Sequence, residues 1–344
     1  MGIAITDLLK SREVSFNELR DKKLAVDAFN MLYQFLSTIR QRDGSLLTDS
    51  DGNVTSHLVG LFARTTNLME KGLKLAFVFD GTVPDLKQEE RTRRKSLKQE
   101  AQRKYELALG REDIGAMKKF ASRTSVLNKE RIEESKKLIS ALGLPTVQAP
   151  SEGEAQASYM VKKNKVFAVI SQDVDSLLFG APLLIRNLSI SGKRKKVGAL
   201  SYTEVKPELI DLSENLNLLG IDQNQLLALA MMVGTDYNKG GIKGIGPKNA
   251  LKLVKQYKNN FDALFKETKW DNYFDYGWEE VYNLIKKMQV TDRYELEWEG
   301  IDEEKVFELL VEKHDFSRER VEKGITKLLK NKKSKEQKGL KDFF

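Results

Sequence analysis

The sequence contains no cysteine, only two histidines and no long apolar run. Without cysteine, the chain has no thiol nucleophile, thiolate zinc site or disulfide. No apolar run approaches the roughly 20 residues that a helix needs to cross a bilayer, which excludes a membrane-spanning class. The N-terminal segment MGIAITDLLK also lacks the basic and then apolar pattern of a signal peptide. An intracellular, cytoplasmic protein is therefore expected.

Histidine is the usual general base of enzymes, yet only His57 and His314 are available here. Catalysis is therefore expected to depend on carboxylates, lysine or a metal ion. The sequence also lacks the phosphate-binding loop of NTPases, the dinucleotide-binding glycine pattern after a strand, and the nucleophile elbow of hydrolases. These three chemistries are accordingly not expected.

Three short apolar segments, LAVDAF, LKLAFVFDG and KVFAVISQDVD, predict buried strands. They are rich in Val, Ile, Phe and Ala, and helix-length amphipathic stretches separate them, as in a parallel sheet covered by helices. The predicted fold class is α/β, with a central mainly parallel sheet flanked by helices. Each segment reaches an aspartate at its end, on the sheet edge where open parallel sheets bind ligands.

Basic residues outnumber acidic ones, 58 to 50, and the net charge of +8 favours an anionic partner. The highly charged, proline-free segment LKQEERTRRKSLKQEAQRKYELALGREDIGAMKKF predicts helix outside the core. At a period of 3.6 residues its basic side chains fall on one face, formed by Lys87, Arg91, Arg94, Lys95 and Lys98. A merely solvated helix face is the alternative interpretation. Because the segment follows Asp80 closely, however, it must lie over the ends of the predicted strands.

Seven acidic residues at strand ends and adjacent turns are candidate metal ligands. They are Asp27, Asp80, Glu152, Glu154, Asp173, Asp175 and Asp236. Singly, several have structural alternatives. Ser151 and Glu154 match a capping box, Asp173 could cap a helix, and Asp80 or Asp236 could belong to a turn. Together, however, the seven would raise one another's pKa unless cations neutralised them.

An all-oxygen ligand set suits Mg²⁺ or Mn²⁺ rather than zinc. Two such ions, roughly 3.5 to 4 Å apart, can activate a water and stabilise the leaving oxygen of a displacement at phosphorus. The remaining negative charge would repel a phosphodiester, and the basic helix face would offset it. The acidic cluster and the basic helix therefore predict phosphodiester hydrolysis in nucleic acid, although Asp173-x-Asp175 also resembles motifs of phosphatases and nucleotidyl transferases.

Several segments resemble the structure-specific 5′ nucleases, and within them the flap endonucleases in their archaeal form. These segments are MGI, VDAFNMLYQFLSTIRQ, TSHLVGLFART, FVFDGTVPDLK, APSEGEAQASYM, SQDVDSLLFG, VGTDYNKGGIKGIGPKNAL and QKGLKDFF. The resemblance covers essentially the whole chain. It implies a PIN-like nuclease fold, two Mg²⁺ ions on the seven carboxylates with Mn²⁺ as an alternative, and hydrolysis one nucleotide into the duplex at a 5′ flap. It further implies 5′ to 3′ exonuclease activity, with roles in Okazaki-fragment maturation and base excision repair.

The resemblance also assigns roles beyond the carboxylates. It carries Lys87 and Arg94 over as the cations on the scissile phosphate, and Tyr33 as an aromatic that stacks on a base, for which a core tyrosine is the alternative. Residues from about 87 to 130 resemble the helical arch through which the flap passes. The implied DNA contacts are Gly2, Arg40, Thr55, Arg64, Glu152, Gly234, Asp236, Gly244, Gly246 and Lys248. The GIKGIGPK segment looks like the family's helix-two-turn-helix element, where a bound K⁺ is implied.

The predicted organisation comprises five parts: an N-terminal nuclease region 1–98, an arch and cap 99–130, an internal nuclease region with the helix-two-turn-helix 131–260, a helical region 261–329, and a flexible tail 330–344. The tail resembles the sliding-clamp (PCNA) binding box at Gln337, Leu340, Phe343 and Phe344. The predicted partners are thus flapped, nicked or gapped DNA and the clamp, with the chain as a monomer. A related exonuclease or repair nuclease, and a non-catalytic junction- or clamp-binding protein, are the alternatives.

Overall fold

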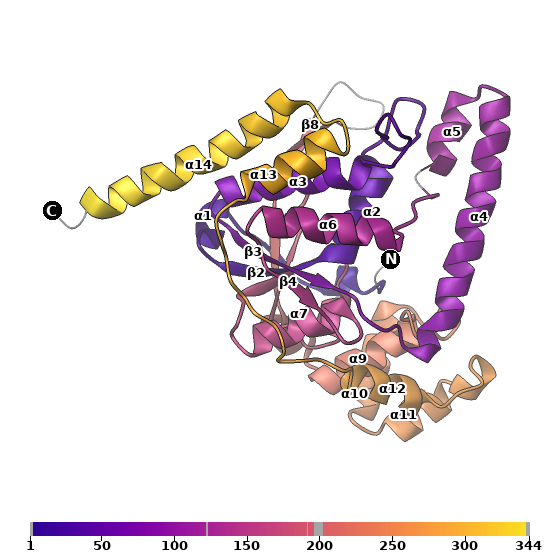
Figure 1. The fold of residues 1–344 in the computed structure, drawn as a ribbon. Coiled ribbons are helices and arrows are strands. Elements are labelled where there is room, and N and C mark those ends of the chain that lie inside the picture. The colour runs from indigo at the N-terminus through magenta and orange to yellow at the C-terminus, as the bar shows by residue number, and fades with distance from the viewer. Residues whose placement is uncertain (1–2, 122, 191, 196–201, 342–344) are drawn as a thin grey trace.

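A seven-stranded sheet forms the centre of the computed structural model, which describes residues 3–121, 123–190, 192–195 and 202–341 (Figure 1). The strand order is β1-β9-β6-β5-β2-β3-β4. The strands are β1 (Arg12–Glu13), β2 (Lys23–Asp27), β3 (Lys74–Phe79), β4 (Thr146–Gln148), β5 (Ala168–Ile170), β6 (Leu183–Arg186) and β9 (Glu208–Asp211). The five strands from β6 to β4 are parallel, whereas β9 runs antiparallel to β1 and β6. The prediction of a mainly parallel α/β sheet is confirmed.

The three strands predicted from apolar segments are β2, β3 and β5, and they lie side by side at the middle of this sheet. Almost all of their residues are buried, which explains why their sequences show no polar alternation. Asp80 does not lie in a hairpin turn, because β3 pairs in parallel with both β2 and β4. The carboxyl ends of the central strands therefore open onto one edge of the sheet.

Helices cover both faces of the sheet (Figure 1). One face is covered by helices that share one hydrophobic cluster with it: α2 (Ala28–Thr38), α3 (Ser56–Glu70), α6 (Lys129–Ala141), α13 (Glu303–Phe307) and the start of α14 (Arg318–Lys341). The helices of the second cluster include α7 (Gly153–Lys162), α9 (Gln223–Val233), α10 (Pro247–Tyr257), α11 (Phe261–Glu267) and α12 (Trp278–Lys286). Two further helices, α1 (Phe16–Leu19) and α8 (Leu212–Leu219), are short, and β7 (Gly192–Lys195) pairs with β8 (Tyr202–Val205) in a separate ribbon. None of the helices in the described ranges combines the length and the apolar composition of a membrane-spanning segment.

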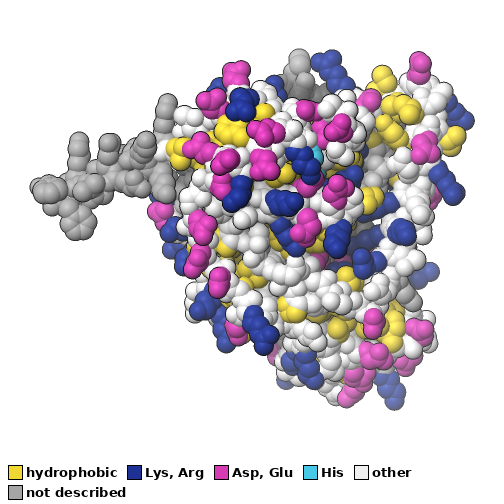
Figure 2. Space-filling view, in the orientation of Figure 1, with side chains coloured by type: hydrophobic (Ala, Val, Ile, Leu, Met, Phe, Trp, Pro, Cys, Tyr) yellow, Lys and Arg dark blue, Asp and Glu magenta, His cyan; other side chains and the backbone are white. Residues whose placement is uncertain are grey.

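Helices α4 (Gln88–Gly110) and α5 (Ile114–Ala121) form a column beside the body of the molecule (Figure 1). The predicted helix outside the core is therefore present. Exposed apolar side chains on it include Leu97, Leu107 and Leu109, so little of α4 is buried against the sheet. Figure 2 shows Lys and Arg side chains gathered where this column faces the body.

The backbone near the C-terminus differs from the sequence-based expectation. Helix α14 continues to Lys341, through the stretch 330–338 for which the sequence predicts a frayed linker. That stretch contains no proline or glycine, and its several lysines, with Glu336 and Gln337, propagate a helix once a preceding segment has nucleated it. The first half of α14 supplies that nucleus, since Val321 and Ile325 are buried against the sheet's helical layer. Phe343 and Phe344 lie outside the described residues.

Both histidines are fully buried in a polar cluster rather than placed among the predicted metal ligands. His314 Nδ1 lies 2.7 Å from Asp49 Oδ2, and its Nε2 lies 3.0 Å from Glu134 Oε1. Lys313 Nζ is 2.7 Å from the same Glu134 oxygen, and His57 Nε2 is 3.6 Å from the other. Burial alone would raise the pKa of Glu134, but contacts with His57 and Lys313 outweigh it and lower that pKa to about 2. Glu134 thus joins α3, α6 and the turn before α14.

Replacing Glu134 with glutamine should destabilise the fold at neutral pH by about 2 kcal/mol, because the half-exposed Lys313 and the buried imidazoles of His57 and His314 lose a charged acceptor. The folded-state pKa is lowered, so this stability is fully present above the ordinary value of 4.5 and is lost as the pH falls towards about 2. Denaturant unfolding at pH 7 and near pH 2 measures the difference. Glu133→Gln, which alters an exposed pair with Lys136 on the same helix, is the matched control. Equal stability of Glu134→Gln and wild type at pH 7 would contradict this role.

Candidate active site

The carboxyl ends of β2 and β5 bring acidic side chains together. Asp27 is the last residue of β2 and also caps α2, since its Oδ1 accepts a hydrogen bond from Asn30 N at 3.0 Å. Ser171 follows β5, and its hydroxyl lies 3.2 Å from Asp27 Oδ2 and 3.5 Å from Glu154 Oε1. One buried hydroxyl therefore joins carboxylates from a strand end and from α7.

The start of α7 brings Glu152 and Glu154 to the same edge. Gly153 N donates to Asp80 Oδ1 at 2.7 Å, and a Cβ at Gly153 would lie only 2.7 Å from that oxygen. The glycine thus allows the helix to begin directly against the end of β3. The capping-box interpretation of Ser151 is wrong, because Glu152 is the N-cap of α7 and Ser151 Oγ donates to Thr82 O at 3.0 Å instead.

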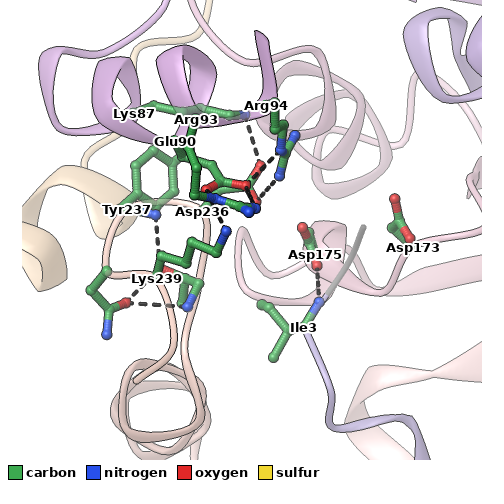
Figure 3. Close-up of polar contacts among 12 residues, drawn as sticks. Ile3, Lys87, Glu90, Arg93, Arg94, Asp173, Asp175, Asp236, Tyr237 and Lys239 are labelled. Carbon is green, nitrogen blue, oxygen red and sulfur yellow. Dashed lines mark hydrogen bonds and ion pairs between the residues drawn. The ribbon is translucent and has the colours of Figure 1, made fainter. Parts of the chain in front are cut away.

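Asp173 and Asp175 lie in the turn after β5. Asn30 Nδ2 donates to Asp173 Oδ2 at 3.0 Å, and Ile3 N donates to Asp175 Oδ1 at 2.8 Å. The helix-cap interpretation of Asp173 is not borne out, since Val174 precedes the 3₁₀ turn Asp175–Leu177 without a side-chain cap. Gly2 itself lies outside the described residues, but its neighbour Ile3 reaches the site (Figure 3).

Asp236 comes from the loop after α9, far along the chain from the sheet. Gly234 makes the necessary turn with φ +112°, and a Cβ there would lie 2.7 Å from Gly241 N, so the loop folds closely on itself. Asp236 then faces the first turns of α4, where Arg94 binds its Oδ1 and Lys87 Nζ lies 3.4 Å from its Oδ2 (Figure 3). Lys87 Nζ also binds Glu152 Oε2 at 2.7 Å. The structure thus brings both predicted catalytic cations onto the acidic cluster.

The electrostatics of the cluster reflect crowding of like charges. Burial, together with the neighbouring Asp80 and Asp173 charges, raises the pKa of Asp27 to about 7. Burial and Glu152 raise the pKa of Asp80 to about 6. The same causes, burial first and then neighbouring carboxylates, raise the pKa of Asp175 to about 7 and that of Glu154 well above its usual range. Several carboxyl groups are therefore held where full ionisation is unfavourable without added positive charge.

Lys87 and Arg94 supply part of that positive charge. Burial alone would lower the pKa of Lys87, but the carboxylates of Glu152 and Asp236 raise it above its ordinary value. For Arg94, burial likewise acts to lower the pKa, and Asp236 and Glu90 more than compensate. Both side chains therefore remain charged at the site.

The acidic cluster fits a hard divalent cation by the chemistry of its donors, all of which are carboxylate oxygens. As they stand, no three acidic or histidine side chains within the described ranges are gathered tightly enough to hold an ion. Two of the predicted ligands, Glu152 and Asp236, are instead paired with Lys87 and Arg94. The raised pKa values of Asp27, Asp80 and Asp175 are the independent sign that the cluster favours added cationic charge.

Two aromatic side chains border the cluster. Tyr33, on α2, is 36% exposed, so it is not the core tyrosine of the alternative interpretation, and Lys98 Nζ of α4 lies 4.6 Å from its ring centroid. Tyr237 follows Asp236, is buried, and has Lys87 Nζ 5.8 Å from its ring centroid. Tyr33 therefore presents an aromatic face between α2 and the basic side of α4.

Three of the predicted DNA contacts lie on the side of α2 and α3, away from the strand ends. Arg40 is bound within the protein, donating to Gly44 O and to Ser125 Oγ at 2.9 Å each. Thr55 is buried at the start of α3, whereas Arg64 is partly exposed on the same helix. Arg40 is therefore held by hydrogen bonds within the protein, and Thr55 is buried. The contact of these residues with DNA stays a prediction.

The predicted helix-two-turn-helix corresponds to α9, the loop that follows it, and α10. Gly244 adopts φ +87° and is exposed, and Gly246 is the N-cap of α10. No atom would lie within 4 Å of a Cβ at either glycine, so this side of the loop is open. Lys248 is exposed in the first turn of α10, where a helix N-terminus and a lysine together favour phosphate.

Sequence reasoning missed two polar residues that hydrogen-bond to the carboxylates, Asn30 and Ser171, and also Tyr237, whose ring lies near Lys87. Asn30 is recognisable afterwards from the spacing Asp27-x-x-Asn30, in which the aspartate caps the helix that carries the asparagine. Ser171, directly after an apolar strand, carried no signal of its own. Tyr237 lay inside the quoted GTDY segment without being given a role.

Comparisons with known proteins agree with this architecture. Residues 1–101 match the model of the XPG N-terminal domain, and residues 143–236 match that of the XPG I-region. The chain is 49% identical over 344 residues to Flap endonuclease 1 of Thermococcus onnurineus, covering 100% of this chain and 99% of the relative. It is 47% identical to Flap endonuclease 1 of Pyrococcus furiosus, again covering 100% and 99%.

Solved structures show the same similarity. Flap endonuclease-1 from Methanococcus jannaschii superposes with a TM-score of 0.76 at 40% identity, covering 97% of this chain and 100% of that one. The catalytic core of Rad2 in complex with DNA substrate superposes with a TM-score of 0.68 at 26% identity, covering 94% and 97%.

Proposed function

The chain belongs to the XPG family of nucleases, with full-length similarity to its flap endonucleases, and we propose that it is a metal-dependent, structure-specific 5′ flap endonuclease with 5′ to 3′ exonuclease activity. In this proposal it cleaves DNA phosphodiesters near the base of 5′ flaps during Okazaki-fragment maturation and base excision repair. The single observation that carries it is the meeting of α4 with the acidic edge of the sheet. There Lys87 and Arg94 approach Glu152 and Asp236.

The seven carboxylates are proposed to hold divalent ions, Mg²⁺ or Mn²⁺. Bound there, such ions would supply Lewis-acid stabilisation of the reacting phosphate and a hydroxide nucleophile at neutral pH. The residues that would hold them are Asp27, Asp80, Glu152, Glu154, Asp173, Asp175 and Asp236. Hydrogen bonds from the protein orient some of these carboxylates before a metal ion binds. Asn30 donates to Asp173, and Gly153 N donates to Asp80.

The chain's own cations have a distinct task in this proposal. Lys87 and Arg94 extend from the first turns of α4 to the acidic cluster, where the phosphodiester is proposed to bind. Their positive charges would stabilise the negative charge that develops on the non-bridging phosphate oxygens during the reaction. The Tyr33 ring offers a stacking surface for a base next to that phosphate. The open glycine side of the loop before α10, with Lys248, is suited to holding duplex phosphates without reading sequence, and a K⁺ ion bound by backbone carbonyls belongs to the same proposal.

Cleavage of matched labelled substrates tests this function. A 5′ flap, a blunt nick and a bubble of the same sequence are compared in Mg²⁺ with the full chain. The proposal expects the flap to be cut fastest, close to its base, and a chelator to stop the reaction. Preference for the bubble or nick would favour a different nuclease of the family, and junction binding without any cleavage would leave only a non-catalytic role.

Deleting residues 337–344 should remove stimulation by a sliding clamp while leaving intrinsic flap cleavage unchanged. The deletion removes Gln337, Leu340, Phe343 and Phe344, whose two terminal aromatic side chains match an anchor for a partner pocket. Multiple-turnover rates with and without the clamp, for the full chain and the truncated one, measure the effect. Undiminished stimulation of the truncated chain would show that the clamp binds elsewhere.

A further inference from the structure

Glu90, on the first turn of α4, is a buried carboxylate at the junction of three cationic side chains. It is only 5% exposed. Its Oε1 accepts from Arg94 Nε at 2.8 Å and from Arg93 at 2.9 Å, while its Oε2 accepts from Arg93 Nε at 2.8 Å. Lys239 Nζ lies 3.0 Å from the same Oε2. A buried carboxylate is tolerated only when it is paired in this way.

The hydrogen bond between Glu90 and Arg94 orients the guanidinium of Arg94, a proposed catalytic group. The guanidinium is bound at both ends, by Glu90 through Nε and by Asp236 through its terminal nitrogen (Figure 3). If Asp236 turns to a metal ion, Glu90 is the partner that continues to orient Arg94. A long arginine side chain without such an anchor would recover rotamer freedom and would occupy the productive direction less often.

The contact with Lys239 reaches a second element. Lys239 lies three residues after Asp236, in the loop between α9 and α10 that is proposed to hold the duplex. Glu90 therefore joins that loop to the base of α4 through one carboxylate. A displacement of the loop would move Lys239, and through Glu90 it would change the position of Arg94.

We infer that Glu90 is a positioning residue, which couples the duplex-binding loop to the orientation of Arg94. This inference rests on the proposed function and assigns to Glu90 no contact with DNA. It acts through Arg94, so its loss should affect the chemical step and leave affinity for the substrate nearly unchanged.

The test is the single-turnover rate of flap cleavage in Mg²⁺ at saturating enzyme, alongside the Kd for the flap in Ca²⁺. Glu90→Gln should slow cleavage about tenfold, as expected when a reacting group loses its orientation, and should change the Kd by less than about twofold. In an Arg94→Ala background, Glu90→Gln should cause no further slowing, since two residues that act as one unit are not additive. The matched control is Glu13→Gln, which alters an exposed pair with Lys206 on an edge strand.

An unchanged rate for Glu90→Gln, or a further tenfold loss in the Arg94→Ala background, would overturn the inference. If Glu90→Gln does not fold, Lys239→Met tests the same link from the loop side. It should slow cleavage about threefold alone and not at all in the Arg94→Ala background. Additive losses there would also overturn the inference. Wild-type protein that fails to cut the flap would instead refute the proposed function, so the two failures are distinguishable.

Discussion

Replacing Asp173 with alanine should abolish Mg²⁺-dependent flap cleavage while largely sparing binding of the DNA junction. Asp173 lies in the turn after β5 and adds to the electrostatic repulsion that raises the pKa of Asp27, Glu154 and Asp175. Loss of a metal ligand removes several kcal/mol of transition-state stabilisation, so we expect a rate at least about 10³-fold lower. Single-turnover cleavage and junction affinity measure the two quantities separately.

For the stability of the fold, we expect Asp173→Ala to have the opposite effect to its effect on activity. Without metal, removing one of several crowded carboxylates relieves repulsion, so the melting temperature of Asp173→Ala in chelator should equal or exceed that of wild type. Asp173→Asn, which keeps the size of the side chain, should be equally inactive. Asp262→Ala, at an exposed position in α11, is the control for a general effect of losing a carboxylate. Retained cleavage by Asp173→Ala would refute the assignment of this site.

Replacing Lys87 or Arg94 with alanine should slow the chemical step by roughly 10²-fold or more, the loss expected when a preorganised contact to transition-state charge is removed. Both cations reach the acidic cluster from α4, at Glu152 and Asp236. Because their positive charge is directed to the reacting phosphate, the rate constant should fall much more than the affinity. Single-turnover rates at saturating enzyme provide the measurement.

Lys87→Met is a useful companion, because it keeps the aliphatic part of the side chain and removes the charge that lies 5.8 Å from the ring centroid of Tyr237. It should be as slow as Lys87→Ala. Lys206→Ala removes an exposed lysine at an edge strand and serves as the control for net charge. Rates equal to wild type for Lys87→Ala and Arg94→Ala would exclude α4 from catalysis.

The central strands and their aspartates were predictable because each signal is local. An apolar run without alternation, with an acidic residue at its end or within three residues after it, identifies β2, β3 and β5 together with Asp27, Asp80 and Asp173. Parallel pairing then places all three residues on one edge of the sheet. Nothing beyond strand length and composition was needed for this part of the site.

The contacts around those aspartates were not predictable in the same way, because they depend on distant segments. Ser151 and Glu154 have the spacing of a capping box, yet the hydrogen bond from Ser151 to Thr82 O and that from Gly153 N to Asp80 prevail. Asp236 reaches the cluster only because Gly234 and Gly241 allow their loop to fold tightly. Local spacing cannot reveal such tertiary choices.

Glu90 illustrates the same limit on the basic helix. In the sequence it is one acidic residue in a charged segment, where a solvated position is the ordinary expectation. Glu90 is buried because α4 packs against the loop that carries Lys239. The spacing of residues along a helix does not reveal this contact between distant segments. The stretch 330–338 shows the opposite case, in which local propensity decided the structure. Its composition suggested a linker, but its residues favour a helix, and α14 continues through it.

The most direct test of the account is the number of Mn²⁺ ions bound per chain. The electron paramagnetic resonance signal of free Mn²⁺ is followed during titration of the protein with a nicked product duplex, and the duplex alone is subtracted. The account predicts two tightly bound ions for the wild type, as a two-metal phosphodiesterase requires, and fewer for Asp173→Asn. No tightly bound ion in the wild type, or an unchanged pair in the variant, would contradict it.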